Sequence, residues 1–501
     1  MRFAWVLLCL PIWAQTDPAV KAARQYRQAH EREIVSSLMD LLTIPAVAAN
    51  PDGLRKAATE ISARLQKRGA QVRLLEHPGS APVVYGEIRR PGATRTVLFY
   101  AHYDGQPVNP KDWVTPPFQP TLRNAPLERD GQIIPLPEPG KPFDPEWRIY
   151  ARSASDDKAP VVSILTALDA LRAAKIEPTA NLKFVFEGEE EAGSPHLEQI
   201  LAANKQLLAA DVWLICDGPV HQSRTSQIVF GVRGVVAFEL TVYGARRELH
   251  SGHYGNWSPN PAMQLAQLLA SMKDAEGRVI IDGYNDGAVP LGPLENQAIA
   301  DAPEIDEALK KELWLGRTEG AGRKLADLIN LPSLNVRGLT SARTGDTATN
   351  VIPASATASI DIRLVKGITP AQAIARLRAH IQKQGYTIVN RPPDGATRLA
   401  HPKLVYFEEE TGGYEAVRTP MDLPVSQMVL KAAERARTPV IRLPTLGGSL
   451  PLIMIERQLN VRTITIPIAN HDNSQHSSNE NLRLQNLWDG IDLMAALLTM
   501  N

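Results

Sequence analysis

The stretch TVLFYAHYD, residues 96–104, decides how the fold is interpreted, because its middle is apolar or aromatic at every position. A strand of this kind must be covered on both faces. Similar strands are predicted at LKFVF (182–186) and DVWLICD (211–217), and helices are predicted at 159–174 and 195–208. Strands that are apolar on both faces and alternate with helices predict an α/β fold with a doubly wound, mostly parallel sheet.

The sequence pattern changes near Gly231. VVAFELTVYG (235–244) and ATASIDIRLV (356–365) alternate apolar and polar residues, as half-exposed strands do. An amphipathic helix that begins after Thr369 follows the second of them. This order of strands and helices predicts a small α+β domain inserted into the first domain. The predicted boundaries are 15–230 and 417–501 for the two parts of the larger domain, and 231–416 for the insertion.

Residues 1–14, MRFAWVLLCLPIWA, are typical of a secretory signal peptide, with an early positive charge, an apolar run and a small final residue. The run is shorter than the roughly 20 residues that span a bilayer, and a buried N-terminal helix is the alternative. Removal of the signal would take Cys9 and leave Cys216 alone, so no internal disulfide is expected. We therefore expect a periplasmic or secreted protein.

The overall charge excludes some classes of partner. Lys and Arg together number 54, and so do Asp and Glu, so no net field attracts nucleic acid or an anionic membrane surface. We expect no nucleic-acid partner and, after signal cleavage, no membrane partner. The substrate must therefore be recognised by a local site.

Two of the predicted strands end in groups that bind metal ions or protons. His102 and Asp104 are two residues apart at a strand end, so their side chains point to the same side, and the carboxylate can orient the imidazole. FVFEGEEEAGSP (184–195) changes from a strand into four glutamates within five positions. Like charges this close repel one another unless they face water or a cation.

Further acidic and imidazole groups are predicted at the same sheet edge. Asp217 ends a third strand, and His471 and His476 follow a fourth. Asp156 and Asp157 precede a helix, where a simple helix cap is the alternative explanation. Ligands of open α/β sheets bind beyond the carboxyl ends of the strands. Histidines and carboxylates converging there predict a divalent metal site, with zinc as the default and two close cations as an explanation for so many carboxylates.

Eight short motifs occur in order and resemble the dinuclear-zinc peptidase family of carnosinase-type dipeptidases, glutamate carboxypeptidases, aminoacylases and succinyl-diaminopimelate desuccinylases. They are HYD (102–104), SASDDKA (153–159), EGEEEAGS (187–194), CDGP (216–219), LHSGHYG (249–255), NVIP (350–353), GGSLP (447–451) and HSSNE (476–480). EGEEEAGS, LHSG and the Pro-rich segment 105–149 favour the dipeptidase and carboxypeptidase branch. The resemblance implies that the larger domain is catalytic and that the insertion is a lid and dimerisation domain, so a homodimer is expected.

The resemblance also implies a cofactor, two Zn²⁺ per subunit, with Mn²⁺ or Co²⁺ as possible substitutes. The implied ligands are His102, Asp156 and Asp217 for one ion, and Asp156, Glu191 and His476 for the other, with Asp156 bridging. Asp104 would orient His102. Glu190 would be the general base that takes a proton from the bridging water and delivers it to the leaving amine.

The lid is expected to supply substrate contacts. By resemblance, His250 would polarise the scissile carbonyl from the other subunit of the dimer. Asn350 and Arg363 would grip the substrate carboxylate, as a guanidinium can with two parallel hydrogen bonds. Gly448 and Ser449 would line the same pocket.

The sequence departs from the family pattern in the loop before Asp156. Ala151-Arg152-Ser153 stands where the family has Gly-Arg-Gly, so the loop must take another path if a position there needs a positive φ. Three alternatives remain open: Asp157 for Asp156, His471 for His476, and His253 for His250. Among the other glutamates, Glu187 is expected to support the turn and Glu189 to face water.

The sequence thus predicts metal-dependent hydrolysis of an amide bond in a dipeptide or small peptide with a free carboxylate. An N-acyl-amino-acid deacylase with the same site is the near alternative. A non-catalytic periplasmic peptide-binding protein is the alternative from another class. Glu190 argues against it, because a binding protein needs no base beside its metal ions.

Overall fold

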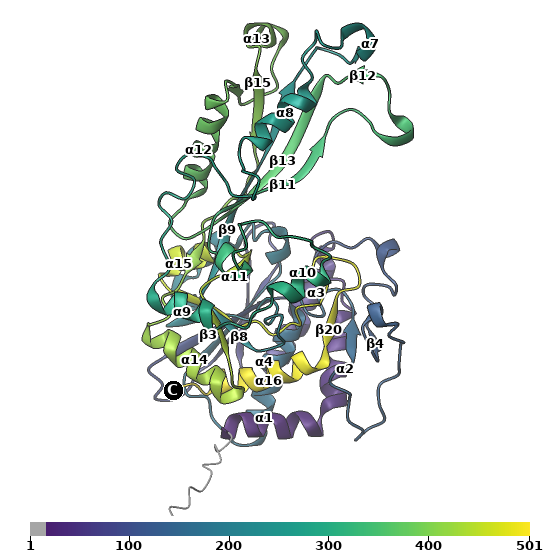
Figure 1. Ribbon diagram of the computed structural model, residues 1–501. Coiled ribbons are helices and arrows are strands. Elements are labelled where there is room, and N and C mark those ends of the chain that lie inside the picture. Colours follow the sequence, from purple (N-terminus) through teal and green to yellow (C-terminus); the bar gives the residue numbers. More distant parts are fainter. Residues whose placement is uncertain (1–16) are drawn as a thin grey trace, which may run out of the picture.

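The computed structural model describes residues 17–501, and the predicted signal peptide at residues 1–14 lies outside them. Figure 1 shows a large α/β domain from which a smaller, elongated domain extends. Among the described residues, no helix combines the length and the apolar character that crossing a bilayer requires.

The large domain is built on a mixed sheet with the strand order β1-β2-β6-β3-β7-β19-β8-β17. Its strands are β1 (Gln71–Leu75), β2 (Val83–Ile88), β3 (Thr96–His102), β6 (Asn181–Glu187), β7 (Val212–Ile215), β8 (Gln227–Val229), β17 (Ile441–Leu443) and β19 (Arg462–Thr465). The central strands β6, β3, β7 and β19 are parallel to their neighbours in this order. Antiparallel pairs occur at β1–β2, β2–β6 and β19–β8. This arrangement confirms the predicted doubly wound, mostly parallel fold.

Helices cover both faces of this sheet. Successive side chains of a strand point to opposite sides, so a strand that is apolar throughout presents an apolar surface on each face. In β3, Val97 and Phe99 pack with one group of helices, and Leu98 and Tyr100 with the other. The first group is α1 (Pro18–Ala29), α2 (Glu31–Leu42), α3 (Pro51–Lys67), α4 (Lys158–Ala173), α14 (Pro424–Ala436) and α16 (Leu484–Leu498). The second is α5 (Leu197–Ala203), α6 (Lys205–Leu208) and α15 (Leu452–Leu459).

The inserted domain is built on a second sheet with the order β11-β13-β9-β15-β14. Its strands are β9 (Gly231–Tyr243), β11 (Ser333–Thr340), β13 (Ser355–Leu364), β14 (Thr387–Val389) and β15 (Leu404–Glu409). The helices α8 (Pro261–Ala270) and α12 (Pro370–Lys383) pack on one face, against Phe238, Leu240 and Val242 of β9. This is the predicted α+β insertion.

The long strand β9 joins the two domains. Its first residues pair with β16 (Val417–Arg418) and β18 (Leu446–Ser449), and its later residues pair with β13 and β15. One part of the insertion returns to the large domain: α9 (Pro293–Asp301), α10 (Asp306–Glu312) and α11 (Leu325–Leu328) lie there in Figure 1. Asp301 of α9 pairs with Arg442 of β17 at 3.0 Å. Residues of the insertion therefore contribute to both domains.

The far end of the insertion carries β10 (Leu249–His250) paired with β12 (Val351–Ile352), and the helices α7 (Ser251–Tyr254) and α13 (Gly395–Ala400) (Figure 1). A third small sheet, β20 (Asn481–Arg483), β5 (Arg148–Tyr150) and β4 (Thr121–Arg123), lies on the large domain. Short 3₁₀ turns occur at Pro110–Asp112, Leu127–Arg129, Glu190–Ala192 and Gly345–Thr347. Since β5 and β20 are antiparallel neighbours, the loop after β5 lies beside the segment before β20.

Candidate metal centre

The predicted strand ends meet at the carboxyl edge of the large sheet. His102 is the last residue of β3, the glutamate cluster follows β6, and Asp217 follows β7. These strands are adjacent and parallel, so their carboxyl ends lie at one edge. The segment after β19 brings His476, and the loop after β5 brings Asp156. Residues from five parts of the chain therefore face one another.

Two groups of side chains have the geometry of metal ligands. The ligand atoms of His102, Asp156 and Asp217 lie within 4.8 Å of one another, and so do those of Asp156, Glu191 and His476. Nε2 of His102 is 3.0 Å from Oδ1 of Asp156. Nε2 of His476 is 3.3 Å from Oδ2 of the same aspartate. Asp156 therefore offers one oxygen to each group.

Burial makes this concentration of acids costly unless a cation is present. Burial, followed by the negative charge of Asp156, raises the pKa of Asp217 to about 6 and that of Glu191 to about 7. Burial also acts to raise the pKa of Asp156, but hydrogen bonds with His102 and His476 outweigh it and hold that pKa below its usual range. Oδ2 of Asp156 is buried, and Nε2 of His476 lies 3.3 Å from it. Imidazole nitrogens and carboxylate oxygens of this kind fit zinc or a similar divalent ion.

Asp104 connects the two groups. Its Oδ1 lies 3.3 Å from Nδ1 of His102, so the carboxylate can fix the orientation of that imidazole. Its Oδ2 accepts a hydrogen bond of 3.0 Å from the backbone N–H of Glu191. One buried carboxylate thus holds a member of each group in place.

Glu190 lies beside both groups but belongs to neither. Its Oε2 is 3.8 Å from Nε2 of His102, and burial raises its pKa well above the usual value. Glu187 is buried and accepts a hydrogen bond of 2.6 Å from Tyr100, which is a supporting contact. The expectation that Glu189 faces water is wrong. Its carboxylate accepts from the backbone N–H of Ala81 at 2.9 Å, because the turn folds this glutamate back onto the segment before β2.

The alternatives to Asp156 and His476 lie outside both groups. Asp157 is fully buried, and its Oδ2 accepts a hydrogen bond of 3.1 Å from the backbone N–H of His102. His471 follows the same strand as His476, but burial lowers its pKa, and the charges with the largest opposing effect are those of Asp472 and Glu312. Both residues therefore have surroundings that differ from those of a ligand in these groups.

A cavity of about 340 Å³ opens beside the two groups. Its lining includes Asp156, Glu190, Asp217, Arg363, Gly448, Ser449 and His476, together with Gly218, Pro219, Leu446, Leu450 and Gln475. Nη1 of Arg363 donates a hydrogen bond of 2.8 Å to Oγ of Ser449. Three of the four predicted substrate-binding residues therefore lie beside the acidic groups: Arg363, Gly448 and Ser449.

The family model for Peptidase family M20/M25/M40 matches residues 98–500. The chain belongs to this family. It is accordingly a metallopeptidase, and the resemblance stated on the sequence motifs is confirmed.

Relatives of the M20/M25/M40 family match over nearly the whole chain. The Cys-Gly metallodipeptidase dug1 of Schizosaccharomyces pombe is 26% identical over 479 residues, covering 92% of this chain and 94% of the relative. The Beta-Ala-His dipeptidase of Homo sapiens is 26% identical over 500 residues, covering 94% and 90%. The solved structure of the M20 family metallo-carboxypeptidase Sso-CP2 from Sulfolobus solfataricus has a TM-score of 0.74 at 27% identity, covering 93% of this chain and 98% of that one. Human carnosine dipeptidase 1 shares the fold, with a TM-score of 0.70 at 23% identity over 96% and 98% of the chains.

Two predicted contacts of this M20/M25/M40 chain lie far from the cavity. His250 and Asn350 are exposed on the far end of the lid, where the backbone N–H of Ser251 donates to the carbonyl of Asn350 at 2.9 Å. Figure 1 shows α7 and β12 at the end of the lid that points away from the large sheet. The ring of His253 lies 4.5 Å from that of His250. Within one chain, neither histidine lines the cavity.

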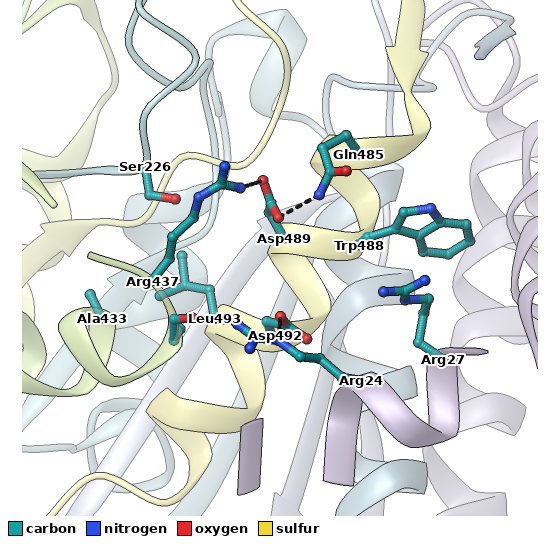
Figure 2. Close-up of a pocket in the computed structure, with 11 residues that line it drawn as sticks. Arg24, Arg27, Ser226, Ala433, Arg437, Gln485, Trp488, Asp489, Asp492 and Leu493 are labelled. Atoms are coloured by element: carbon teal, nitrogen blue, oxygen red, sulfur yellow. Dashed lines mark hydrogen bonds and ion pairs between the residues drawn. The ribbon is translucent and has the colours of Figure 1, made fainter. Parts of the chain in front are cut away.

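A separate cavity of about 230 Å³ lies between α1, α14 and α16. Figure 2 shows Arg437 paired with Asp489, which also accepts a hydrogen bond of 2.7 Å from Gln485. Nε of Arg24 lies 2.5 Å from Oδ2 of Asp492. These pairs fasten α1 and α14 to α16, so the cavity is a part of the helix packing rather than the active site of this peptidase.

Two functional contacts were absent from the sequence prediction. Nε2 of Gln106 donates a hydrogen bond of 2.7 Å to Oε2 of Glu191. Glu480 is fully buried and accepts several hydrogen bonds from the loop that carries Asp156. Glu480 ends the motif HSSNE, and Gln106 lies two residues after the motif HYD. Their positions beside these motifs indicate that they lie near the site, but do not predict which residue each side chain contacts.

Proposed function

We propose that this protein hydrolyses the amide bond of a dipeptide or another small peptide with a free carboxylate, with two zinc ions and Glu190 as the general base. The observation that supports this most is the geometry of two ligand groups that share Asp156, with a buried glutamate beside them that belongs to neither. Relatives over nearly the whole chain are named as a Cys-Gly metallodipeptidase and a Beta-Ala-His dipeptidase. Their names favour a dipeptide substrate for this chain.

The residues divide the chemical work. His102, Asp156 and Asp217 would hold one zinc ion, and Asp156, Glu191 and His476 the other. When bound, the ions would supply a lowered pKa for water and polarisation of the scissile carbonyl. Manganese or cobalt can replace zinc at such nitrogen and oxygen ligands.

Glu190 carries the proton in this proposal. It takes a proton from the attacking water and delivers it to the departing amine, which needs a carboxylate within reach of the water that is not itself a ligand. Its position 3.8 Å from His102 at the wall of the cavity satisfies this requirement. Burial raises the pKa of Glu190 above its usual value.

Arg363 and Ser449 would bind the substrate carboxylate. They are already joined by a hydrogen bond of 2.8 Å on the cavity wall, so the guanidinium is directed into the site. The cavity of about 340 Å³ suits a short peptide and excludes a folded protein chain.

We propose further that the protein is a periplasmic or secreted homodimer joined through the lid. His250 and Asn350 of one chain would then reach the cavity of the other. Exposed apolar side chains that follow His250 in the sequence, Trp257 at 78% and Met263 at 59%, favour a partner on the lid. Mixing an inactive His250→Ala variant with an inactive Glu190→Ala variant tests this arrangement. Subunit exchange should restore part of the activity, and a mixture without activity would contradict a shared site.

The central experiment separates metal binding from turnover. Glu190→Ala should bind two zinc ions per chain, as the wild type does, and lose nearly all hydrolysis of dipeptides. Glu198→Ala, an exposed glutamate on α5, is the matched control and should keep full activity. Full activity of Glu190→Ala would exclude the proposed base. If the wild type hydrolyses N-acetyl or N-succinyl amino acids in place of dipeptides, the protein is a deacylase. If the wild type binds zinc but hydrolyses none of these substrates, the protein is a binding protein.

A further inference from the structure

We propose that Glu480 is the positioning residue that holds Asp156 where both metal ions need it. This inference rests on the proposed function, because it concerns the ligand that two zinc ions would share. Glu480 does not line the cavity and belongs to neither ligand group. Its effect is transmitted through the backbone of the loop 151–157.

The carboxylate of Glu480 accepts five hydrogen bonds from this loop, three of them from backbone N–H groups. Oε1 accepts from the backbone N–H of Ser155 at 2.9 Å, from that of Asp156 at 3.0 Å and from Oγ of Ser155 at 3.0 Å. Oε2 accepts from the backbone N–H of Ser153 and from Nη1 of Arg152, both at 2.9 Å. Glu480 is 0% exposed. Charge-assisted bonds in such an environment are stronger than neutral ones, so together they fix the loop.

The loop needs this support because of its own sequence. Ser153 has a φ of 64°, in the left-handed region that glycine adopts without cost and serine does not. Its hydroxyl is buried without a hydrogen-bond partner. The hydroxyl also fills the space beside Gly105, where an added Cβ would lie 2.3 Å from Oγ of Ser153. A strained serine persists only where its surroundings hold the backbone, and the bond from its N–H to Glu480 does so.

Chain topology gives Glu480 control over both ion sites. It lies four residues after His476 and directly before β20, which pairs with β5, and β5 leads into the loop. The backbone carbonyl of Glu480 also accepts from the N–H of Ala151 at 3.1 Å. One segment therefore supplies His476 to one group and fixes Asp156, the member of both. Gln106 differs, because its side chain donates a hydrogen bond to Glu191, which belongs to one ligand group only.

Glu480→Gln tests this inference, because it preserves the size of the side chain but replaces one acceptor oxygen with an NH₂ group that faces N–H donors. We expect both zinc affinities of the purified protein to fall roughly 10–100-fold, the range for loss of a group that orients metal ligands. Competition with a chromophoric chelator measures the two affinities. The absorption spectrum of the Co²⁺-loaded protein should change as well, since it reports ligand geometry independently of activity.

The matched control is Glu31→Gln. Glu31 is also buried, and its carboxylate accepts from the backbone N–H of Phe143 at 2.8 Å and from Nη1 of Arg27 at 2.6 Å, none of them proposed ligands. This variant should lose stability but keep both zinc affinities. Should Glu480→Gln not fold, the same measurements on Glu480→Asp apply, because the shortened side chain keeps the charge but loses its reach.

The outcomes distinguish this inference from the function on which it rests. Unchanged zinc affinities and an unchanged Co²⁺ spectrum in folded Glu480→Gln or Glu480→Asp would overturn the positioning role alone. Loss of one zinc affinity with the other intact would also overturn it, because Asp156 is shared. A wild type that binds no zinc would overturn the proposed function and this inference together. Partial recovery of affinity in Ser153→Gly/Glu480→Gln, whose loop backbone carries less strain, is the expected supporting result.

Discussion

Replacement of Arg363 by methionine should weaken recognition of the substrate carboxylate and leave the chemical step intact. The methionine preserves the apolar stem of the side chain. The neighbours keep partners, because Oγ of Ser449 also donates to the carbonyl of Gly234 at 3.3 Å, and Asp361 also accepts from Asn335 at 2.9 Å. The variant therefore removes a cation from the cavity, while Ser449 and Asp361 each keep one hydrogen-bond partner.

The expected loss follows from the surroundings of the guanidinium. A hydrogen bond to a charged group contributes about 1.5–3 kcal/mol. The Arg363 side chain is 38% exposed, and its Nε lies 3.3 Å from Oδ2 of Asp361, so solvent and a counter-charge reduce the value. We therefore expect about 1.5–2 kcal/mol, which corresponds to a loss of roughly 10–30-fold in kcat/KM.

The assay compares a dipeptide with the same dipeptide carrying a C-terminal amide. Wild type should prefer the free acid by about the factor above, and Arg363→Met should hydrolyse the two at similar rates. Arg337→Met, whose side chain on β11 is also 38% exposed, should retain the wild-type preference. An equal loss of kcat/KM on the acid and on the amide would refute the proposed contact, because it would mean that Arg363 acts on the chemistry or on the fold.

Three further outcomes can be checked. Gln106→Leu should weaken only one of the two zinc affinities, about 10-fold, because the Gln106 side chain holds Glu191, which is not the shared ligand. Equal weakening of both affinities in the chelator assay would contradict this prediction. Ser153→Gly should raise the free energy of unfolding by about 1 kcal/mol in a denaturant titration. The glycine removes the cost of a positive φ and of a buried unpaired hydroxyl, and this gain exceeds the cost of the greater conformational entropy of glycine in the unfolded chain. Burial raises the pKa of Asp492 from 3.8 to about 6 despite its ion pair with Arg24, so the folded protein binds this proton more tightly than the unfolded chain. Lowering the pH from 7 to 4.5 should therefore stabilise wild type relative to Asp492→Asn, and melting temperatures that differ by the same amount at both pH values would be the contrary result.

The centre of the site was predictable because parallel strands impose a simple rule. His102 and Asp217 follow strands whose apolar character on both faces marks them as central and parallel, and such strands end at one edge of the sheet. Glu190 and Glu191 follow the strand on the other side of β3 in the same way. Four residues from three separate segments of the sequence could therefore be placed together from strand patterns and motifs alone.

The contacts that hold these residues could not be placed, because they cross between segments with no shared pattern. The bonds from the loop to Glu480 join positions more than 300 residues apart, and nothing local to HSSNE indicates its partner. Glu189 resembles its acidic neighbours in sequence, yet a turn folds it onto the backbone of Ala81. The single helix predicted at 195–208 is two helices in the structure, α5 and α6, with Asn204 between them.

The loop before Asp156 holds a serine in a backbone conformation that glycine favours. Its sequence predicted another path if a positive φ were required, and the structure has the positive φ at Ser153 in spite of the serine. The cost is about 1–2 kcal/mol for an L-residue in the left-handed region. Each hydrogen bond to a charged acceptor contributes about 1.5–3 kcal/mol, and the loop makes several of these to one buried carboxylate. The bonds therefore outweigh the strain, and the position of Asp156 depends on Glu480 rather than on glycine at residue 153.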